Sequence, residues 1–473
     1  MIKHVIAGLE RTSERTFDDV NPWTQKVHAQ VALGDARDVD DAVAAARAAF
    51  DAGPWPRMGF AERGRLLHRL ADLIERRTAE LAAADSDDMG KPIADLKHKD
   101  IPRAASNFRF FADHARITTA ERYPMDSGHH AYAEFPPAGV VAAIAPWNFP
   151  LMLETWKVAP ALAWGNTVVL KPAEDSPGSA TILARLAIEA GLPPGVLNVV
   201  HGFGPGSAGE WLTHHPGVDR ITFTGDSTTG RIIGQAAAKR LCPVSLELGG
   251  KGANLVFEDA NLDEAVAWSD RAIFSNAGQI CLAGSRLYVQ RSIFARFLDR
   301  FVAAAEAHVL GAPDDPNTTI GPLSSKAHFQ KVTHYLTEMP PGEGRIVTGG
   351  AMTDGSWAVR PTVIVDAPAT ARVCREEIFG PVVTIAPFDT EDEAVRLAND
   401  SRFGLNAMVF TENLRRAHRV ARALRAGTVW VNCFFIRDLR APFGGVGDSG
   451  VGREGGSFSR EFFTEPKAVV IQV

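Results

Sequence analysis

Hydrophobic positions follow two different rhythms along the chain, and the change falls near residue 140. Before it, apolar residues recur at helical spacing over 39–52 and 60–84, up to a polar, glycine-containing break at 89–92. After it, short apolar β-type runs come at 140–144, 167–170, 196–200, 220–223 and 244–246, mostly separated by helical segments such as 181–190. Covering helices followed by repeated βαβ units predict a doubly wound parallel sheet, with residues 140–247 as its body.

The same alternation restarts after Lys251. Strands are predicted over 253–257, 287–290, 382–385 and 428–431, with helices that begin at residues 262 and 293. A second α/β lobe is therefore expected, and a site between the lobes is favoured because ligand pockets often form at such interfaces. The final run 468–473 is β-forming without an obvious partner, so it either pairs across a subunit interface or forms an ordinary edge strand.

Composition narrows the class of partner. A chain of 473 residues exceeds one ordinary core, which agrees with two large lobes. Its 22% charged residues and net charge of −6 leave no basic stripe, so neither nucleic acid nor a membrane surface is an expected partner.

No apolar run approaches the about 18 residues of a membrane span, and no signal peptide is visible. The four cysteines form no disulfide framework. We expect a cytoplasmic protein with a small-molecule partner, and no His cluster has the spacing of metal ligands, so no metal site is predicted.

Cys281 is the strongest candidate for chemistry. It follows a turn of small residues and glycine, 274–280, where its sulfur would be exposed to a substrate. A thiol nucleophile needs a nearby base and an oxyanion donor. Glu247, at the end of an apolar run, and Asn148, in a proline-flanked turn, would supply both if the fold brings them together. Taken singly, Glu247 is equally well a surface carboxylate and Asn148 a turn residue.

Several loops that follow predicted strands point to a dinucleotide. Lys171 and Glu174 follow one strand and are placed to meet ribose hydroxyls, while the segment 223–227 follows another and precedes a helix, where backbone amides hold phosphate. The segment 204–209 matches G-x-G-x-x-G, but it carries a proline inside the turn and is weak alone. Any single loop could merely connect strands, whereas several along one sheet edge favour a nucleotide site.

With these features in place, the chain resembles the NAD(P)-dependent aldehyde dehydrogenase superfamily over its whole length. The resemblance implies a doubly wound parallel-sheet cofactor domain (1–115 and 138–248), a second α/β catalytic domain (249–461) and a small β extension for oligomerisation (116–137 and 462–473). It also implies a homodimer or a homotetramer. Seven motifs match in order, namely Pro146-Trp147-Asn148-Phe149-Pro150, Lys171-Pro172-Ala173-Glu174, Phe223-Thr224-Gly225, Glu247-Leu248-Gly249-Gly250-Lys251, Gly278-Gln279-Ile280-Cys281, Glu377-Ile378-Phe379-Gly380-Pro381 and Pro442-Phe443-Gly444-Gly445.

The resemblance assigns roles to the candidate residues. Cys281 is the expected nucleophile, the Asn148 side chain and the Cys281 backbone amide form the oxyanion hole, and Glu247 is the base that activates water. Thiolate attack on an aldehyde gives a thiohemiacetal, and loss of hydride to the nicotinamide leaves a thioester that water cleaves. Relatives that pass the acyl group to coenzyme A commonly lack a glutamate at this position, so Glu247 favours a free acid product. Lys157 and Glu454 match positions proposed to relay the proton from Glu247.

The expected cofactor is NAD in preference to NADP. By the resemblance, Glu174 contacts the adenosine ribose, where a carboxylate accepts hydrogen bonds from a 2′-hydroxyl and repels a 2′-phosphate. Three residues depart from the family pattern: Asp226 stands where many relatives have serine, beside the expected pyrophosphate, Ala173 replaces a common serine, and Gly447 stands where many have lysine. The expected cofactor contacts are Ala145, Pro146, Trp147, Lys171, Ala173, Glu174, Gly204, Phe223, Thr224, Gly225, Asp226, Leu248, Gly249, Glu377 and Phe379.

Substrate choice depends on residues 432–440. Their pattern, Asn-Cys-x-x-x-Arg-Asp-Leu-Arg, is similar to the muconic-semialdehyde dehydrogenase branch, which oxidises acidic, conjugated aldehydes from ring-cleavage pathways. The two arginines of this segment, Arg437 and Arg440, would bind the carboxylate through planar donors, with Arg103 on a predicted helix as a further candidate. The alternative is that these arginines pair with Asp438 or Asp100 for structure. The expected pocket wall, which suits a neutral aromatic or aliphatic aldehyde equally well, consists of Phe149, Leu153, Trp156, Phe435 and Phe443.

Three other hypotheses stay open. The first is a broad-specificity dehydrogenase of neutral aldehydes. The second is a cysteine hydrolase of esters or thioesters, which would use Cys281 without a nicotinamide, although Glu174 and Glu377 argue against it. The third is a catalytically retired binding protein, which the retention of Cys281, Glu247 and Asn148 opposes.

Overall fold

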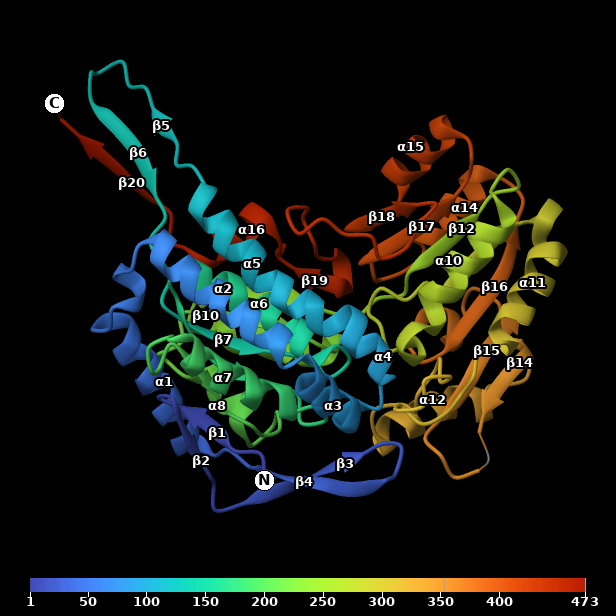
Figure 1. The fold of residues 1–473 in the computed structure, drawn as a ribbon. Coiled ribbons are helices and arrows are strands. Elements are labelled where there is room, and N and C mark those ends of the chain that lie inside the picture. The colour runs from blue at the N-terminus through green and yellow to red at the C-terminus, as the bar shows by residue number, and fades with distance from the viewer. Residues whose placement is uncertain (353, 473) are drawn as a thin grey trace.

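The computed structural model describes residues 1–352 and 354–472, which form two α/β lobes and a projecting β extension (Figure 1). The first lobe contains an eight-stranded sheet in the order β19-β11-β10-β7-β8-β9-β1-β2. Its five central strands are parallel, and all five are confirmed where the hydrophobic pattern predicts them. They are β7 (Val140–Ile144), β8 (Thr167–Lys171), β9 (Leu197–Val199), β10 (Arg220–Thr224) and β11 (Val244–Glu247), flanked by antiparallel β1 (His4–Ile6), β2 (Leu9–Arg11) and β19 (Gly450–Val451).

Helices cover both faces of this sheet because successive residues of each central strand point to opposite sides. Val141 and Ala143 of β7 pack into the core formed with α2, α5, α6 and α7, whereas Val140 and Ala142 pack into the core formed with α1, α8 and α9. These helices are α1 (Ala36–Asp51), α2 (Phe60–Arg76), α5 (Ile101–Ile117), α6 (Pro150–Ala163), α7 (Gly178–Ala190), α8 (Ala208–His214) and α9 (Ser227–Ala238).

The helical pattern predicted over 60–84 is not one continuous helix. Helix α2 ends at Arg76, and a new helix, α3 (Thr78–Met89), begins after the connecting residue Arg77. The predicted break after it is confirmed, because Gly90 adopts a left-handed φ of 76° and ends α3. Short helical segments complete this lobe: η1 (Trp55–Arg57), α4 (Ile93–Asp95), the π-helical η2 (Leu96–Asp100) and α16 (Gly456–Phe463).

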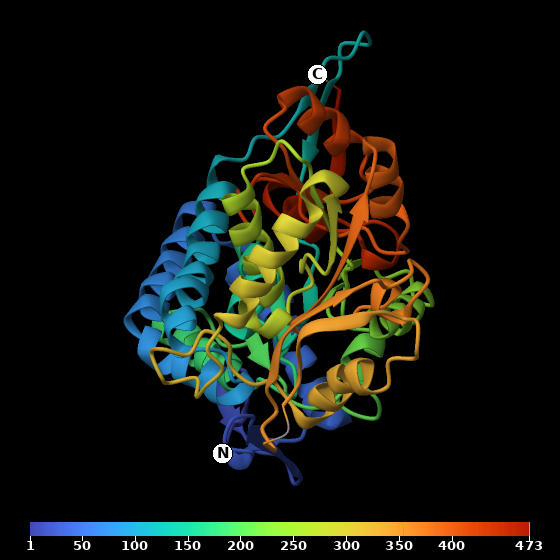
Figure 2. The same cartoon turned by 90° about the vertical axis from the view of Figure 1, so that its right-hand side faces the viewer.

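The second lobe contains a seven-stranded sheet in the order β14-β15-β16-β13-β12-β17-β18, parallel except for the edge strand β14. Figure 2 turns this lobe toward the viewer, with α11 (yellow) on the near side. Strand β17 is central and fully buried although the hydrophobic pattern did not single it out. The strands are β12 (Ala253–Val256), β13 (Arg286–Gln290), β14 (Arg345–Ala351), β15 (Val359–Val365), β16 (Val382–Phe388), β17 (Asn406–Phe410) and β18 (Thr428–Val431).

Two groups of helices sandwich the second sheet. Helices α10, α11 and α12 share a core with one face, and α14 and α15 share a smaller core with the other. Their bounds are α10 (Leu262–Phe274), α11 (Phe294–Glu306), α12 (Lys326–Thr337), α14 (Glu391–Asn399) and α15 (Leu414–Ala423), with the short segments η3 (Ser275–Gly278), η4 (Arg291–Ile293), α13 (Arg372–Arg375) and η5 (Gly447–Ser449).

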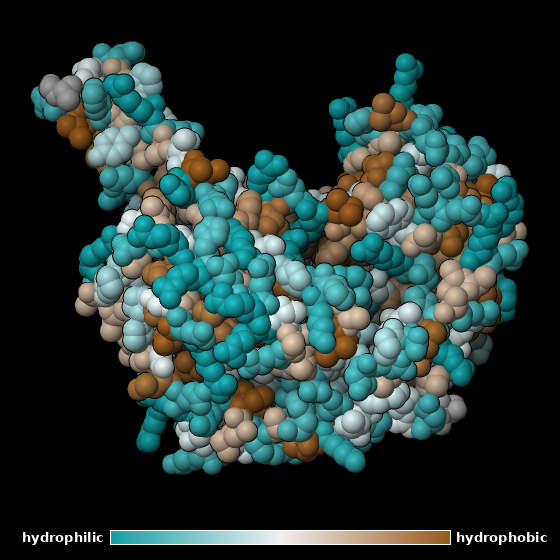
Figure 3. Space-filling view, viewed as in Figure 1, coloured by the Kyte–Doolittle hydropathy of each residue, from teal (hydrophilic) through white to brown (hydrophobic). Residues whose placement is uncertain are grey.

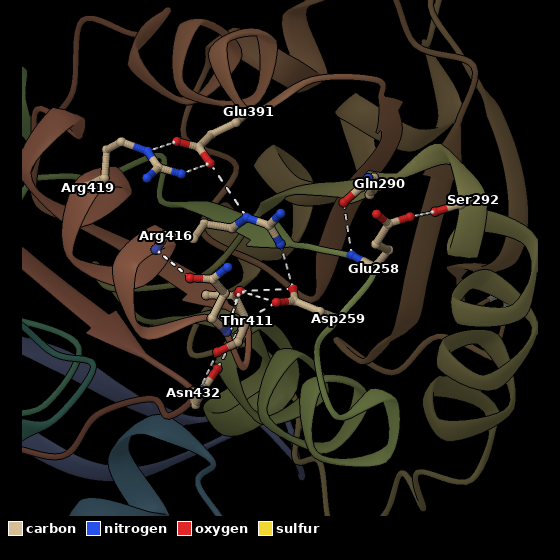
Figure 4. Close-up of polar contacts among 10 residues, drawn as sticks. Glu258, Asp259, Gln290, Ser292, Glu391, Thr411, Arg416, Arg419 and Asn432 are labelled. Atoms are coloured by element: carbon tan, nitrogen blue, oxygen red, sulfur yellow. Dashed lines mark hydrogen bonds and ion pairs between the residues drawn. The ribbon is translucent and has the colours of Figure 1, made fainter.

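Ion pairs close the carboxyl edge of the second sheet (Figure 4). Asp259, after β12, accepts hydrogen bonds from Thr411, after β17, and from the Arg416 guanidinium at 2.7 Å. Glu391 at the start of α14 pairs with Arg419 at 2.5 Å and faces Arg416 at 3.5 Å. Because its own side chains fill this edge, the opposite, amino edge of the sheet is the one left to face the first lobe.

The third sheet projects from the body (Figure 1, upper left). It is antiparallel, in the order β20-β6-β5, with β20 (Lys467–Ile471), β6 (His130–Glu134) and β5 (Arg122–Tyr123). The terminal run is thus an edge strand of its own chain, paired through Val469 with Tyr132, while Val473 lies outside the described residues. A separate ribbon of β3 (Thr16–Asn21) and β4 (Lys26–Ala32) lies below the first lobe (Figure 1). Of the helices in the described part of the chain, none combines the length and apolar character of a membrane span.

Candidate active site

Two sheet edges meet at the site, in the hollow between the lobes (Figure 3). Asn148 and Asp226 follow the carboxyl ends of β7 and β10, and Glu247 is the last residue of β11. Cys281 and Glu377, in contrast, precede the amino ends of β13 and β16 in the second lobe. The carboxyl edge of the first sheet is a typical ligand edge of α/β proteins. The second lobe contributes the amino edge of its own sheet, because ion pairs occupy the carboxyl edge of that sheet.

Cys281 is presented by a strained turn. The backbone takes positive φ at three successive residues, Asn276 (51°), Ala277 (53°) and Gly278 (70°). Gly278 is required because a Cβ there would lie 2.1 Å from the Gly380 carbonyl oxygen. Such strain persists only where the surroundings over-determine it, and it is typical of functional sites. The turn ends α10 abruptly and directs the following residues between the two lobes.

The Cys281 thiol is half-buried rather than openly exposed. Burial, and then the carboxyl groups of Glu377 and Glu247, raise the pKa of this thiol to about 12, while the Arg437 guanidinium opposes the shift. The resting thiol is therefore protonated at neutral pH. A nucleophilic role at this position requires a proton acceptor when the thiol reacts.

Asn148 and the cysteine turn are joined across the lobes. The Asn148 side-chain amide donates a hydrogen bond to the Gln279 carbonyl oxygen at 2.9 Å, and the Asn276 side chain donates to the Asn148 carbonyl oxygen at 2.8 Å. The turn is held further because Gln279 accepts a hydrogen bond from the Ser324 backbone amide at 3.0 Å. Since an amide NH₂ carries two donor hydrogens, Asn148 keeps one beyond the Gln279 bond.

Glu247 is buried, and neither carboxyl oxygen has a hydrogen-bond partner among the described residues. Burial, and then the neighbouring Glu454, raise the pKa of Glu247 well above its usual range, against the opposing charges of Lys157 and Arg437. The Gly444 backbone passes so close that a Cβ there would lie 2.7 Å from Glu247 Oε1. A buried carboxyl with a raised pKa is suited to accept a proton near neutral pH.

Lys157 and Glu454 form a buried pair behind Glu247. The Lys157 ammonium lies 3.2 Å from Glu454 Oε1 and donates to the Thr222 hydroxyl at 3.0 Å. The indole N–H of Trp156 donates to the other oxygen of Glu454 at 2.6 Å. The sequence had placed Trp156 in the pocket wall, and this second contact of its ring nitrogen has no sequence signal.

One cavity, of about 200 Å³, opens on the thiol from the side of the first sheet. Trp147 and Phe379 meet edge to face at 5.4 Å, and Glu377 accepts a hydrogen bond from the Gly250 amide at 2.8 Å. A Cβ on Gly249 would lie 2.1 Å from Glu377, so the backbone approaches this carboxyl closely. The cavity is lined by Cys281, Asn148 and the predicted cofactor contacts Pro146, Trp147, Thr224, Gly225, Asp226, Leu248, Gly249, Glu377 and Phe379, together with two residues that sequence reasoning missed, His328 and Lys331.

The other predicted cofactor contacts lie along the same sheet edge, outside the lining of this cavity. Lys171 faces Glu174 at 3.4 Å, and the Gly204 loop adjoins Lys171, because a Cβ on Gly209 would contact both Gly204 and Lys171. Ala145 donates its backbone N–H to the Lys171 carbonyl oxygen at 3.1 Å, and Ala173 accepts one from Ser176 at 3.2 Å. The Phe223 ring packs against Gly225. A groove with glycines, a buried carboxyl and exposed strand-end amides fits a dinucleotide.

Asp226 occupies the amino end of α9. Its carboxylate accepts hydrogen bonds from the Thr228 and Thr229 amides at 2.6 and 3.3 Å. This is the position where the sequence predicts amides that hold phosphate, so an anionic side chain of the chain itself already caps the helix there.

A second cavity, of about 220 Å³, opens on the other side of the cysteine turn. Its lining includes Arg103, Phe149, Leu153, Trp156, Phe435 and Arg437 from the predicted substrate residues. Phe443 lies outside the lining, behind Arg437, whose guanidinium carbon sits 3.8 Å from the centre of the Phe443 ring. Residues not predicted for this cavity are Lys91, Asp95, Lys99, Asp100, Asn107, Met152, Arg271, Ser275, Asn276, Ile280 and Phe434.

The two arginines of the segment 432–440 have different surroundings. Arg440 pairs with Asp438 at 2.6 Å on the exposed surface, as the structural alternative requires. Arg437 has no carboxylate partner within 4.0 Å in the described part of the chain, and its Nη2 is buried without a hydrogen bond. Burial lowers the pKa of Arg437 to about 10, so it stays charged at neutral pH. Asp100, the other suggested partner, is bound by Lys91 at 2.5 Å, while Arg103 donates to Asn107 at 3.1 Å.

A possible metal-binding group lies away from both cavities. Ligand atoms of Asp19, His28 and Asp88 lie within 4.8 Å of one another. Sequence reasoning missed this group because its members are far apart along the chain and only folding brings them together.

Comparison with known proteins agrees with this geometry. The model of the "Aldehyde dehydrogenase family" matches residues 9–469. The chain belongs to the aldehyde dehydrogenase family. It is 49% identical to a 2-hydroxymuconic semialdehyde dehydrogenase of Pseudomonas sp. (strain CF600), covering 100% of this chain and 99% of the relative. It is 46% identical to a 2-aminomuconic 6-semialdehyde dehydrogenase of Pseudomonas sp., covering 100% and 98%.

Solved structures confirm the predicted aldehyde dehydrogenase fold. The NAD⁺ complex of an aldehyde dehydrogenase from Bacillus cereus superposes with a TM-score of 0.97 at 41% identity, over 100% of this chain and 96% of that one. The resemblance inferred from seven motifs is therefore confirmed, and the protein is an oxidoreductase that acts on aldehydes.

Proposed function

We propose that this aldehyde dehydrogenase oxidises an acidic, conjugated semialdehyde from the breakdown of aromatic compounds to the carboxylic acid. The observation that carries the proposal is Arg437, a charged guanidinium in the wall of the second cavity with no carboxylate partner among the described residues. A buried charge is costly unless a ligand pairs with it. The names of the relatives with 49% and 46% identity, both muconic semialdehyde dehydrogenases, support the same substrate class.

In the proposed reaction, Cys281 sulfur bonds to the aldehyde carbon and the carbonyl oxygen becomes an oxyanion. The free N–H of Asn148 and the backbone N–H of Cys281 stabilise that charge, because preorganised donors act strongly at a site shielded from water. The thiol proton must leave as the bond forms. Glu247 is the nearest buried carboxyl with a raised pKa, which supports it as the proton acceptor.

The thiohemiacetal formed in this way would lose its hydride to the nicotinamide cofactor and so become a thioester. Glu247 then activates water against the thioester, which releases the acid and frees Cys281. Its buried, unbonded oxygens support this role, since a base that is already hydrogen-bonded would be weaker. The proton then leaves through Glu454 and Lys157, which lie 3.2 Å apart behind Glu247. Thr222 contacts both groups and extends the route by one hydroxyl.

NAD is the proposed cofactor, in preference to NADP. When bound, its nicotinamide supplies the hydride acceptor. The residues that would hold it are those of the first cavity, together with Lys171 and Glu174 for the adenosine ribose. Glu174 supports the preference because its partly exposed carboxylate would repel a 2′-phosphate.

The ratio of kcat/KM for NAD over NADP should fall markedly in Glu174→Ser. An unchanged ratio would disprove the role of Glu174 in the choice of cofactor.

Arg437 and Arg103 are proposed to bind the substrate carboxylate. Both stack on the Trp156 ring, at 4.9 and 5.8 Å from its centre, so one aromatic surface orients the two cations. Planar guanidinium groups bind a carboxylate in a bidentate manner. The Arg437 guanidinium acts electrostatically on the Cys281 thiol, so a substrate bound by Arg437 would lie near Cys281.

The test is NADH formation with paired acidic semialdehydes and their neutral esters. Wild-type enzyme should favour the acids, and Cys281→Ala should form no NADH with either. Loss of charge-assisted hydrogen bonds worth about 1.5 to 3 kcal/mol should lower the acid preference of Arg437→Ala by about 10- to 100-fold. Arg440→Ala is the matched control, because this arginine already pairs with Asp438. Equal preference in wild type and Arg437→Ala would refute the carboxylate-binding role.

We also propose that the chain forms a homodimer or homotetramer through residues 116–137 and 462–473. The projection of sheet β20-β6-β5 from the body supports this assignment, because such a sheet buries little surface within its own chain. Sedimentation of the purified protein tests the oligomeric state.

The four free cysteines support a reducing, cytoplasmic setting for the protein.

A further inference from the structure

The substrate cavity contains more positive than negative charge. Both of its acidic residues are already paired: Asp100 lies 2.5 Å from Lys91, and Asp95 lies 2.6 Å from Lys99. Three arginines of the lining have no carboxylate within 4.0 Å in the described ranges 1–352 and 354–472, namely Arg103, Arg271 and Arg437. The cavity thus presents three uncompensated cations.

These arginines come from three separate elements. Arg103 lies on α5, Arg271 in the last turn of α10, and Arg437 in the loop after β18. Figure 1 shows α5 and α10 in different lobes, on the two sides of the central space. Arg103 and Arg437 share the Trp156 ring, whereas Arg271 rests on the Trp268 ring at 5.3 Å. Arg103 and Arg437 therefore form a pair of cations at one wall of the cavity, and Arg271 is a separate cation at another wall.

Nothing else in the described structure holds Arg271 in place. Its neighbour in sequence, Asp270, is bound by His308 at 3.1 Å. Arg271 is exposed, so it lies toward solvent, while Arg437 lies deeper with a buried Nη2. Arg103 also disfavours the charged form of Arg437, which shows that the inner pair repel each other. An anionic ligand relieves that repulsion.

One carboxylate accounts for the inner pair but not for Arg271. A carboxylate has two oxygens and is bound by planar guanidinium groups at one point. We propose that the aldehyde substrate carries two negative charges, and that Arg271 binds the second one at the cavity mouth. The inference rests on the proposed function and narrows its substrate class to a semialdehyde with two carboxylates, or with one carboxylate and an ionised enol.

The experiment compares kcat/KM for four aldehydes of matched length. They carry two carboxylates, one carboxylate and one methyl ester, two methyl esters, or one carboxylate and an enol. Wild-type kcat/KM should be about tenfold or more higher for the diacid than for the monoester, because the monoester loses one charge-assisted hydrogen bond. The enol compound should match the diacid only above the pH at which its enol ionises, which separates the two sources of the second charge.

Arg271→Ala should reduce the diacid-to-monoester ratio to about one, and Arg271→Lys should restore part of it. The matched control is Arg296→Ala, which removes an exposed arginine from α11 outside the cavity and should leave the ratio at the wild-type value. Because the readout is a ratio between two substrates, a general loss of folded enzyme cancels.

The failures are distinguishable. If wild-type enzyme favours the diester over both acids, the proposed acidic substrate class is itself wrong. If it uses the monoester as well as the diacid, yet prefers both to the diester, only the second charge is disproved. If Arg271→Ala keeps the wild-type ratio, the second charge is not bound by Arg271 and the inference falls.

Discussion

At the scale of single residues, burial decides the chemistry of Cys281. The motif places a thiol after a strained turn, but the raised pKa comes from groups far away in sequence, chiefly the enclosing protein, Glu377 and Glu247. The thiol is thus protonated in the resting protein, which protects it from adventitious oxidation. Its reactivity depends on a change at the site rather than on a resting thiolate.

The first prediction concerns alkylation of Cys281 by iodoacetamide in the cofactor-free protein. Since a pKa of about 12 makes the thiolate fraction rise with pH throughout the neutral and alkaline range, the rate should increase about tenfold per pH unit from 7 to 10. Arg437→Ala should react more slowly, because the opposing positive charge is gone. Mass spectrometry of the Cys281 peptide measures the rate, and a plateau below pH 9 would contradict the raised pKa.

The second prediction concerns the Trp156 N–H bond to Glu454. Trp156→Phe keeps an aromatic ring but removes this 2.6 Å donor, so Glu454 should be held less well for proton transfer. We expect kcat to fall about threefold to tenfold, with a shifted pH profile and a visible burst of NADH as thioester hydrolysis slows.

Trp164→Phe is the control, because the Trp164 indole nitrogen is buried without a hydrogen-bond partner in the described chain. That variant should keep the wild-type pH profile. An identical profile in Trp156→Phe would show that the contact to Glu454 is structural only.

At the scale of elements, helix α9 shows how one residue changes a site that the fold provides. A helix that follows a parallel strand offers free amides to phosphate, but here Asp226 accepts hydrogen bonds from two of them. Burial raises the pKa of Glu377, which lines the same cavity, to about 7, and the charge of Asp226 adds a smaller contribution to this shift. The helix keeps its cap at the expense of a more negative cofactor groove.

The third prediction is that Asp226→Ser binds NAD more tightly. Serine caps a helix as aspartate does, so the melting temperature should stay unchanged, while removal of a negative charge beside the pyrophosphate should lower the Kd about threefold to tenfold. Quenching of tryptophan fluorescence by NAD measures the Kd. Asp226→Ala should lose about 1 kcal/mol of stability through the missing cap. Weaker NAD binding by Asp226→Ser would mean that the carboxylate does not oppose the cofactor.

The regular elements follow closely from the hydrophobic pattern. The five central strands of the first sheet and strands β12, β13, β16 and β18 of the second lie where it predicts them, because each is a short run rich in apolar and β-branched residues, most of which are buried. The division of 60–84 into α2 and α3 was missed, since apolar spacing continues across Arg77 and only the backbone changes direction. Strand β14 was missed because Gly349 and Gly350 break its apolar run, and β15 was missed because Arg360 and Pro361 interrupt its beginning.

At the scale of the whole molecule, the β extension projects from the body (Figure 1). Strand β20 pairs on one side with β6, and its Val470 and Ile471 are 56% and 45% exposed. Exposed β-branched side chains on an unpaired strand edge invite association with another chain. The proposed oligomer would cover this surface.

The fourth prediction is that removal of residues 466–473 lowers the mass of the particle. Without β20, strand β6 loses its partner and the extension should no longer support association. Analytical ultracentrifugation should give a smaller species than full-length protein, while circular dichroism at room temperature stays that of a folded α/β protein. A truncated protein of unchanged mass would place the subunit contact elsewhere.

By itself, the sequence determined the two α/β lobes, the order of their main strands and the loops that bear Cys281, Glu247 and Asn148. These are local properties, since burial on a strand or helix repeats with a fixed period and turn residues mark its ends. Only the tertiary structure decided which charges meet. It pairs Asp438 with Arg440, leaves Arg437 and Arg271 without a carboxylate in the described chain, and directs the Trp156 nitrogen to Glu454. Such partners lie up to hundreds of residues apart, and electrostatic energy depends on distance and burial in the folded chain, which no local pattern encodes.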